Sequence, residues 1–178
     1  EVSPGHLRDA VEAANAALRQ WTQTAQPLYW ARAKYALGNA FAALGNHELG
    51  TESFLRAVDA YNDALWEFDP QGSPVEWLRT TKNLARVLVD LGDRESSTGH
   101  VQQAIAQFGN VLTMVTAASD PGTYGWANYY LAACYETLDG RGVPDQFPKA
   151  IEALRAALDG YNREAFPELR AEVQADIG

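Results

Sequence analysis

Apolar side chains recur every three or four residues along most of the chain, and short polar segments separate one apolar stretch from the next. In the first long stretch, four of them fall within about 60° of one another when residues are placed about 100° apart on a helix: Trp30, Leu37, Phe41 and Leu44. A second set shortly afterwards has the same property: Phe54, Val58, Tyr61 and Leu65. Both stretches are therefore predicted to be amphipathic helices.

The same spacing continues to the end of the chain, and no segment alternates between apolar and polar residues as a strand does. We therefore predict an all-α protein with no strands. The expected helices lie near residues 6–21, 28–44, 52–67, 75–91, 98–117, 122–138, 147–163 and 167–177. Polar, glycine-containing loops are expected inside each helix pair, from Gly45 to Thr51, from Gly92 to Gly99 and from Asp139 to Gln146.

The chain repeats itself with a period of 47 residues, which separates Pro27 from Pro74 and Pro74 from Pro121; Pro167 follows after 46 residues. These prolines are expected to begin helices. The backbone N–H groups of the first turn have no partner within the helix, so the missing N–H of proline costs nothing there. Other residue types keep the same register: Leu37, Leu84 and Leu131; Leu44, Leu91 and Leu138; Ala10, Ala57, Ala104 and Ala150. A repeat of this length predicts a stack of similar helix pairs.

The repeated residues resemble the tetratricopeptide pattern, which reads W-x2-L-G-x2-Y in a first helix and A-x3-F followed by A in a second. The first element occurs here as Lys34-x2-Leu37-Gly38-x2-Phe41, and the second as Ala57-x3-Tyr61-x2-Ala64. Small residues at Gly38, Ala85 and Ala132 would let neighbouring helices approach closely, with Tyr61 and Phe108 filling the space between them. The segment PLYWARAKYALGNAFAALG looks like the long bacterial variant of this repeat, here 47 residues instead of about 34.

The resemblance implies a right-handed α-solenoid of antiparallel helix pairs forming one array over residues 1–178. Its expected parts are a half-repeat at 6–21, repeats at 27–69, 74–117 and 121–163, and a half-repeat at 167–178. Arrays of this kind usually end in capping units. We therefore expect either that the chain is part of a longer array or that its ends stack on other copies in a homo-oligomer.

Composition narrows the possible partners. The net charge of −9 argues against nucleic acid, because phosphate recognition needs a basic surface. No stretch approaches the roughly 20 apolar residues of a membrane helix, so we expect a soluble, cytoplasmic protein that does not bind membranes. The single cysteine, Cys134, excludes an intrachain disulfide and is expected to be a buried thiol among apolar helix residues.

No pattern typical of catalysis or cofactor binding is found. His6, His47 and His100 have no second histidine or cysteine at metal-ligand spacing. The segment from Asp139 to Val143 is glycine-rich but lacks the Gly-Lys-Ser/Thr ending of a phosphate loop and follows a helix. We therefore expect no enzyme activity, no cofactor and no bound metal, and an enzyme of helical-repeat form is the least favoured alternative.

In tetratricopeptide repeats the first helices line a concave groove, and the resemblance assigns that face by residue. The predicted peptide-binding residues are Arg32, Tyr35, Asn39, Arg79, Lys82, Arg86, Trp126 and Tyr129, with Asp90 and Glu136 on the same face. Tyrosine, tryptophan and arginine are common at binding hot spots. Exposing the apolar ring of a groove-facing tryptophan to water is unfavourable, which favours a binding role for it. Some relatives bind a terminal carboxylate with lysine, arginine and asparagine, but Tyr35 stands where that lysine would be.

Arg32, Lys34, Arg79, Lys82 and Arg86 concentrate positive charge on two adjacent first helices of an otherwise acidic chain. One interpretation is an ordinary solvated face with a few intrahelical ion pairs. The other is a protein-interaction scaffold whose groove binds a peptide or protein segment, in particular an acidic one. An alternative function is a sensor or assembly segment of a larger signalling protein that self-associates through its ends.

Overall fold

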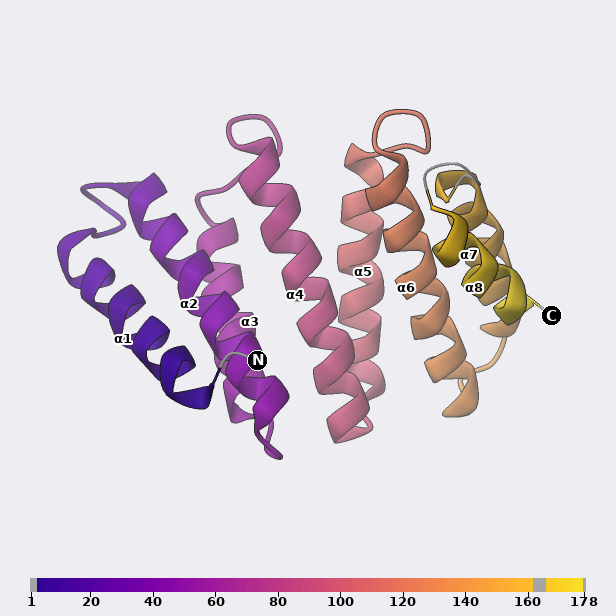
Figure 1. Ribbon diagram of the computed structural model, residues 1–178, viewed down its shortest axis with the longest axis horizontal. Helices are drawn as coiled ribbons and strands as arrows, with labels where there is room; N and C mark the ends of the chain where they lie inside the picture. The colour runs from indigo at the N-terminus through magenta and orange to yellow at the C-terminus, as the bar shows by residue number, and fades with distance from the viewer. Residues whose placement is uncertain (1–2, 162–165, 178) are drawn as a thin grey trace. The chain divides into compact units, whose positions relative to one another are not determined.

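The computed structural model describes residues 3–161 and 166–177 (Figure 1). Within them the regular structure is entirely helical, which confirms the predicted all-α class. The helices are α1 (Pro4–Gln20), α2 (Pro27–His47), α3 (Glu52–Leu65), α4 (Pro74–Glu95), α5 (Thr98–Met114), α6 (Pro121–Gly140), α7 (Phe147–Gly160) and α8 (Pro167–Ile177). Among the described helices, none has an apolar stretch long enough to cross a lipid bilayer.

Proline begins α1, α2, α4, α6 and α8, as the repeat predicts for most of them. Proline suits this place because its fixed φ is already helical and its missing N–H would have no partner in the first turn. Two of these helices also have side-chain caps. Ser3 accepts a hydrogen bond from the backbone N–H of His6, and Asp120 accepts one from that of Thr123 at 3.0 Å.

The first helix of each pair is longer than predicted. The sequence placed loops from Gly45 and from Gly92, but α2 continues to His47 and α4 to Glu95. The predicted start of the first loop, at Gly45, was wrong because Gly45 is a helical residue against which Phe54 packs. A Cβ built on Gly45 would lie 2.5 Å from the Phe54 ring. The second helices α3, α5 and α7 end two or three residues earlier than predicted, and residues 162 and 163 of the helix expected at 147–163 lie outside the described residues.

The chain divides into two compact units, residues 1–97 and 98–178, and the division falls inside the repeat predicted at 74–117. In the first unit each helix packs against the next in sequence, from α1 to α4, and α2 also touches α4. In the second unit α5 packs on α6, α6 on α7 and α7 on α8. Successive helices within each unit run antiparallel, as Figure 1 shows.

In the first unit, α2 and α3 meet where aromatic rings lie directly over glycines. A Cβ on Gly38 would lie 2.6 Å from the ring of Tyr61, just as one on Gly45 would collide with Phe54. Both rings are buried, at 1% exposure each. The sequence-based prediction that Gly38 allows a close approach and that Tyr61 fills the space beside it is therefore confirmed.

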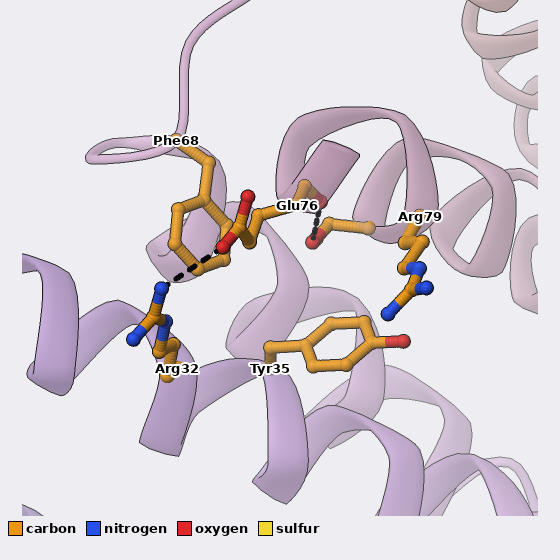
Figure 2. A pocket seen from close by; sticks show the side chains of 6 residues that line it. Arg32, Tyr35, Phe68, Glu76 and Arg79 are labelled. Atoms are coloured by element: carbon orange, nitrogen blue, oxygen red, sulfur yellow. Dashed lines mark hydrogen bonds and ion pairs between the residues drawn. The ribbon is translucent and has the colours of Figure 1, made fainter. Parts of the chain in front are cut away.

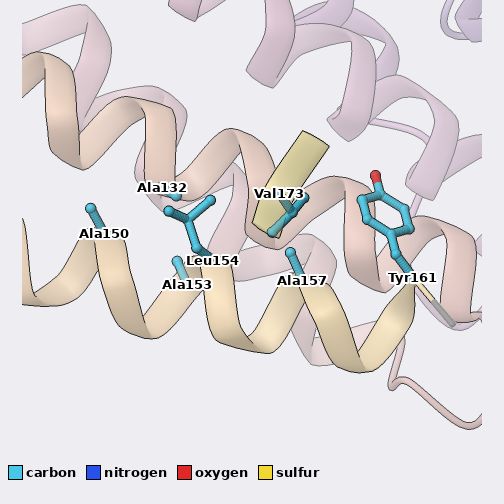
Figure 3. Packing of buried hydrophobic residues seen from close by; sticks show 7 residues of the cluster. All are labelled: Ala132, Ala150, Ala153, Leu154, Ala157, Tyr161 and Val173. Carbon is cyan, nitrogen blue, oxygen red and sulfur yellow. The ribbon is translucent and has the colours of Figure 1, made fainter. Parts of the chain in front are cut away.

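The second unit uses the same device between α6 and α7. A Cβ on Gly125 would lie 2.6 Å from the ring of Tyr161, and one on Gly160 would lie 2.5 Å from the backbone nitrogen of Gly125. Figure 3 shows the core beside this contact, where Val173 of α8 points toward the α7 side chains. The buried residues of this cluster are Ala132, Ala150, Ala153, Leu154, Ala157, Tyr161 and Val173.

Arg94, at the end of α4, holds the first unit together at the loop between α2 and α3. Its Nη1 donates hydrogen bonds to the carbonyl oxygens of Glu48 at 2.6 Å and Gly50 at 2.9 Å. Its guanidinium also lies over the ring of Phe54, 4.5 Å from the ring centroid. One cation therefore satisfies two loop carbonyls and covers the aromatic ring that packs on Gly45.

The glycine contacts predict opposite effects for two alanine substitutions in the second unit. Gly160→Ala should lower the free energy of unfolding by about 1–3 kcal/mol, because its Cβ meets backbone atoms that cannot rotate away. Gly109→Ala on α5 has no atom within 4 Å of the new Cβ and should raise the same quantity by about 0.5–1 kcal/mol. Urea unfolding of the two variants tests this, and a Gly160→Ala midpoint equal to that of the wild type would contradict it.

Candidate functional site

Three of the predicted binding residues line one cavity in the first unit, on the side where α2 and α4 touch. The cavity has a volume of about 220 Å³, and Arg32 and Tyr35 of α2 face Arg79 of α4 across it. Figure 2 shows the guanidiniums of Arg32 and Arg79 on either side of the Tyr35 ring. The remaining lining residues are Phe68, Glu76 and Thr80.

One of the two guanidiniums is already paired within the chain. Arg32 Nη2 donates to Glu76 Oε1 at 3.0 Å, and the two side chains are 57% and 35% exposed. This hydrogen bond is the main reason why the pKa of Glu76 lies below its usual range, and the charge of Arg79 lowers it further. Glu76 is therefore a carboxylate at neutral pH.

Arg79 is exposed and makes no hydrogen bond or ion pair with the described residues. The cavity thus contains two guanidiniums and only one carboxylate. A guanidinium presents several N–H donors in one plane, which suits a carboxylate or phosphate group. Because Arg79 makes no hydrogen bond or ion pair with the described residues, this side of the cavity can accept an anion without first breaking such a contact.

A hydrogen-bond network connects α2, α3 and α4 beside the cavity. Asn39 Oδ1 accepts from the Tyr61 hydroxyl and from Asn83 Nδ2, each at 2.8 Å. Asn83 Nδ2 also lies 3.3 Å from the Tyr35 hydroxyl, to which it donates. Burial raises the pKa of Tyr61 far above its usual value, so its hydroxyl remains a donor. The oxygen of Asn39 thus serves to position the helices.

The other predicted cations on α2 and α4 have different surroundings. Lys34 forms an ion pair with Asp63 of α3 at 2.7 Å, so it points toward α3. Lys82 and Arg86 are half-buried on α4. The charge of Arg86 acts on Asp90, but burial is the larger effect and raises the pKa of that carboxyl. The basic residues of the two helices therefore do not form a single uniform patch.

Trp126 and Tyr129, the predicted binding residues of the second unit, lie on α6 in an aromatic cluster. The half-buried Trp126 ring packs against Tyr130 at 4.9 Å and against Phe108 at 5.5 Å, measured between ring centroids. Neighbouring rings therefore cover much of Trp126, so its presence on this face does not require a partner to cover it. Tyr129 donates its hydroxyl hydrogen bond to Glu172 Oε1 of α8 at 3.1 Å.

Glu76 and Asn83 were not among the residues predicted from the sequence. Glu76 contacts Arg32, and Asn83 contacts Asn39, in each case across 44 residues, which is three fewer than the 47-residue period. The same separation joins Gln23 to Glu67. Residues about one period apart meet on neighbouring equivalent helices, so a search within one helical turn of the 47-residue period would have pointed to both residues.

The remaining candidates for reactive or metal-binding groups in the described part of the chain are the cysteine thiol and clusters of metal-ligating side chains. Cys134 is 1% exposed, which confirms the predicted buried thiol. Residues 3–161 and 166–177 contain no group of three histidine, cysteine, aspartate or glutamate side chains placed to hold a metal ion.

The network predicts that Asn83 stabilises the first unit. Asn83→Ala should lower the free energy of unfolding by about 0.5–1.5 kcal/mol, because Asn39 and Tyr35 each lose a hydrogen-bond donor. Asn62→Ala, at an exposed position of α3, is the matched control and should leave stability unchanged or slightly higher. Equal losses for the two variants in urea unfolding would show that the network contributes nothing.

The Tyr129–Glu172 contact predicts a dependence on alkaline pH. Burial, followed by the hydrogen bond and charge of Glu172, raises the pKa of Tyr129 from 10.0 to about 12. The folded state therefore holds this proton more tightly than the unfolded chain, and the resulting stability is complete below pH 10 and is lost as pH rises toward about 12.

Nuclear magnetic resonance of ¹³Cζ-labelled tyrosine, assigned with Tyr129→Phe, measures this pKa directly. Glu172→Gln should lower the pKa of Tyr129 only part of the way toward 10.0, because the burial of Tyr129 still raises it. An ordinary pKa for Tyr129 in the wild type would contradict the prediction.

Comparisons of the chain with protein-family models, with curated proteins and with solved structures found no match. The function must therefore be inferred from the chemistry of the site itself. That chemistry combines the guanidinium of Arg79, which has no ion pair within the described part of the chain, the paired guanidinium of Arg32, and the Tyr35 ring between them.

Proposed function

We propose that this protein is a tetratricopeptide-like interaction scaffold, and that the α2/α4 face of its first unit binds an acidic segment of a partner protein. The 47-residue period, the antiparallel packing of successive helices and the glycine–aromatic contacts support a repeat array. We propose in addition that the helix pairs follow the right-handed superhelical arrangement of that family.

One observation carries the binding proposal: Arg79 has no ion pair or hydrogen bond with the described residues and lies beside the Tyr35 ring, in a cavity that Arg32 also lines. Arginine and tyrosine provide most of the binding energy at many protein interfaces, because they combine a large contact area with directional hydrogen bonds. Their concentration on an acidic chain favours a partner segment of negative charge.

The fixed geometry of the two helices supports a binding role as well. The backbones that carry Arg32 and Arg79 are held together by the Asn39–Asn83 hydrogen bond and by the α2–α3–α4 packing. A partner segment would therefore meet a preorganised surface, which reduces the entropy lost on binding. The titratable groups in the cavity are arginine, tyrosine and glutamate, without a nucleophile–base pair, so we propose binding without catalysis.

Selection of binders from a library of short random peptides, using the full chain as bait, tests this function. We expect the selected peptides to be enriched in glutamate and aspartate. Arg79→Ala should weaken their binding by about tenfold or more, because it removes the unpaired cation.

Arg19→Ala is the matched control, since it removes the same charge from an exposed position of α1 that does not line the cavity. Circular dichroism should show unchanged helix content for both variants. Selected peptides without acidic residues, or equal binding by the Arg79→Ala variant, would rule out the proposal.

A further inference from the structure

The cavity between α2 and α4 already holds a carboxylate, and that carboxylate belongs to the protein itself. We propose that this cavity is a subsite for one glutamate side chain of the partner, and that Glu76 is an internal competitor which occupies Arg32 until the partner's glutamate replaces it. The inference rests on the proposed function and specifies the group bound and what controls its entry.

The lining of the cavity suits a carboxylate on a short apolar stem. The half-buried ring of Tyr35 provides apolar surface, the buried Phe68 also lines the cavity, and the guanidiniums of Arg32 and Arg79 lie on either side of the Tyr35 ring (Figure 2). The methylene groups of a glutamate could contact the rings while its carboxylate meets the cations. Glu76 itself shows that a glutamate carboxylate fits beside Arg32, with 3.0 Å between Oε1 and Nη2.

The Arg32–Glu76 pair is arranged so that it can exchange. Both side chains are partly exposed, at 57% and 35%, and a single hydrogen bond joins them. Water can replace either partner at such a pair, and exposed ion pairs contribute little to stability. An incoming carboxylate therefore competes with a weak internal contact.

Exchange requires only the Glu76 side chain to move. The backbone carbonyl of Glu76 accepts a hydrogen bond from the buried hydroxyl of Thr80 at 2.7 Å, which fixes this turn of α4. Arg79 lies one turn after Glu76 and makes the first contact with an anion, since it has no hydrogen bond or ion pair with the described residues to give up. Arg32 then becomes available as Glu76 swings away, so that both guanidiniums can bind the same carboxylate.

This arrangement predicts that removing the internal carboxylate strengthens binding. The probe is the capped peptide acetyl-Ala-Leu-Glu-Leu-Ala-amide, titrated into the ¹⁵N-labelled full chain and followed by nuclear magnetic resonance. Glu76→Gln should tighten its binding by about two- to fivefold relative to the wild type, which corresponds to the strength of an exposed ion pair. Glu52→Gln is the matched control, because Glu52 also pairs with an exposed arginine, Arg56 at 2.9 Å, but does not line the cavity.

Two further peptides identify the source of the carboxylate. In the first, glutamine replaces the glutamate and the end remains amidated; in the second, glutamine is present and the C-terminus is free. The glutamate peptide should bind more tightly than both. Tighter binding of the peptide with the free C-terminus would overturn the assignment to a glutamate side chain.

The outcomes separate this inference from the function on which it rests. If the wild type binds the glutamate peptide, Arg79→Ala weakens that binding and Glu76→Gln matches the wild type, then the acidic groove stands and the internal competitor is excluded. If neither the wild type nor Glu76→Gln shows shifts at cavity residues, the proposed acidic groove fails together with this inference. Binding by Glu76→Gln alone would support an internal competitor strong enough to close the subsite.

Discussion

The contact of an aromatic ring with a glycine is the constraint on which the α2/α3 and α6/α7 pairs depend. A ring lying on Gly38, Gly45 or Gly125 brings two helices closer than any side chain with a Cβ would permit. Interiors are packed to crystal-like density, so such contacts fix both the spacing and the register of the helices. The contact of Gly160 with the backbone of Gly125 is the closest of these approaches, because no side chain separates the backbones of α6 and α7 there.

The same contact links the core to the surface. The ring of Tyr61 packs on Gly38, while its hydroxyl reaches Asn39, which in turn accepts a hydrogen bond from Asn83 of α4. Packing of α2 on α3 therefore determines where α4 lies relative to α2. The spacing of Arg32 and Arg79 follows from this, because each is carried by one of these two helices. The packed core thus fixes the position of this charged face.

Charge is distributed unevenly over the chain, and the cavity shows why this matters. The protein carries a net charge of −9, yet two guanidiniums stand beside Tyr35 on α2 and α4. Without Glu76 these two cations would face each other across a small space. The Arg32–Glu76 pair moderates that repulsion in the free protein. If the cavity binds an acidic segment as proposed, Glu76 would compete with that segment for Arg32, and a modest affinity with rapid exchange would follow.

The helices, the 47-residue period and the role of Gly38 beside Tyr61 were determined by the sequence itself, because helix periodicity and proline placement are local properties. The resemblance to the tetratricopeptide pattern predicted Arg32, Tyr35 and Arg79 on one face, and these three residues line one cavity. Only the tertiary structure decided that Gly45 packs instead of ending α2, that Asn39 is held by Tyr61 and Asn83, and that Trp126 lies among other rings. The pairing of Arg32 with Glu76 also belongs to the tertiary structure. The Arg32–Glu76 and Asn39–Asn83 contacts join residues 44 positions apart, and which residues meet depends on how the helices pack, which no local pattern specifies.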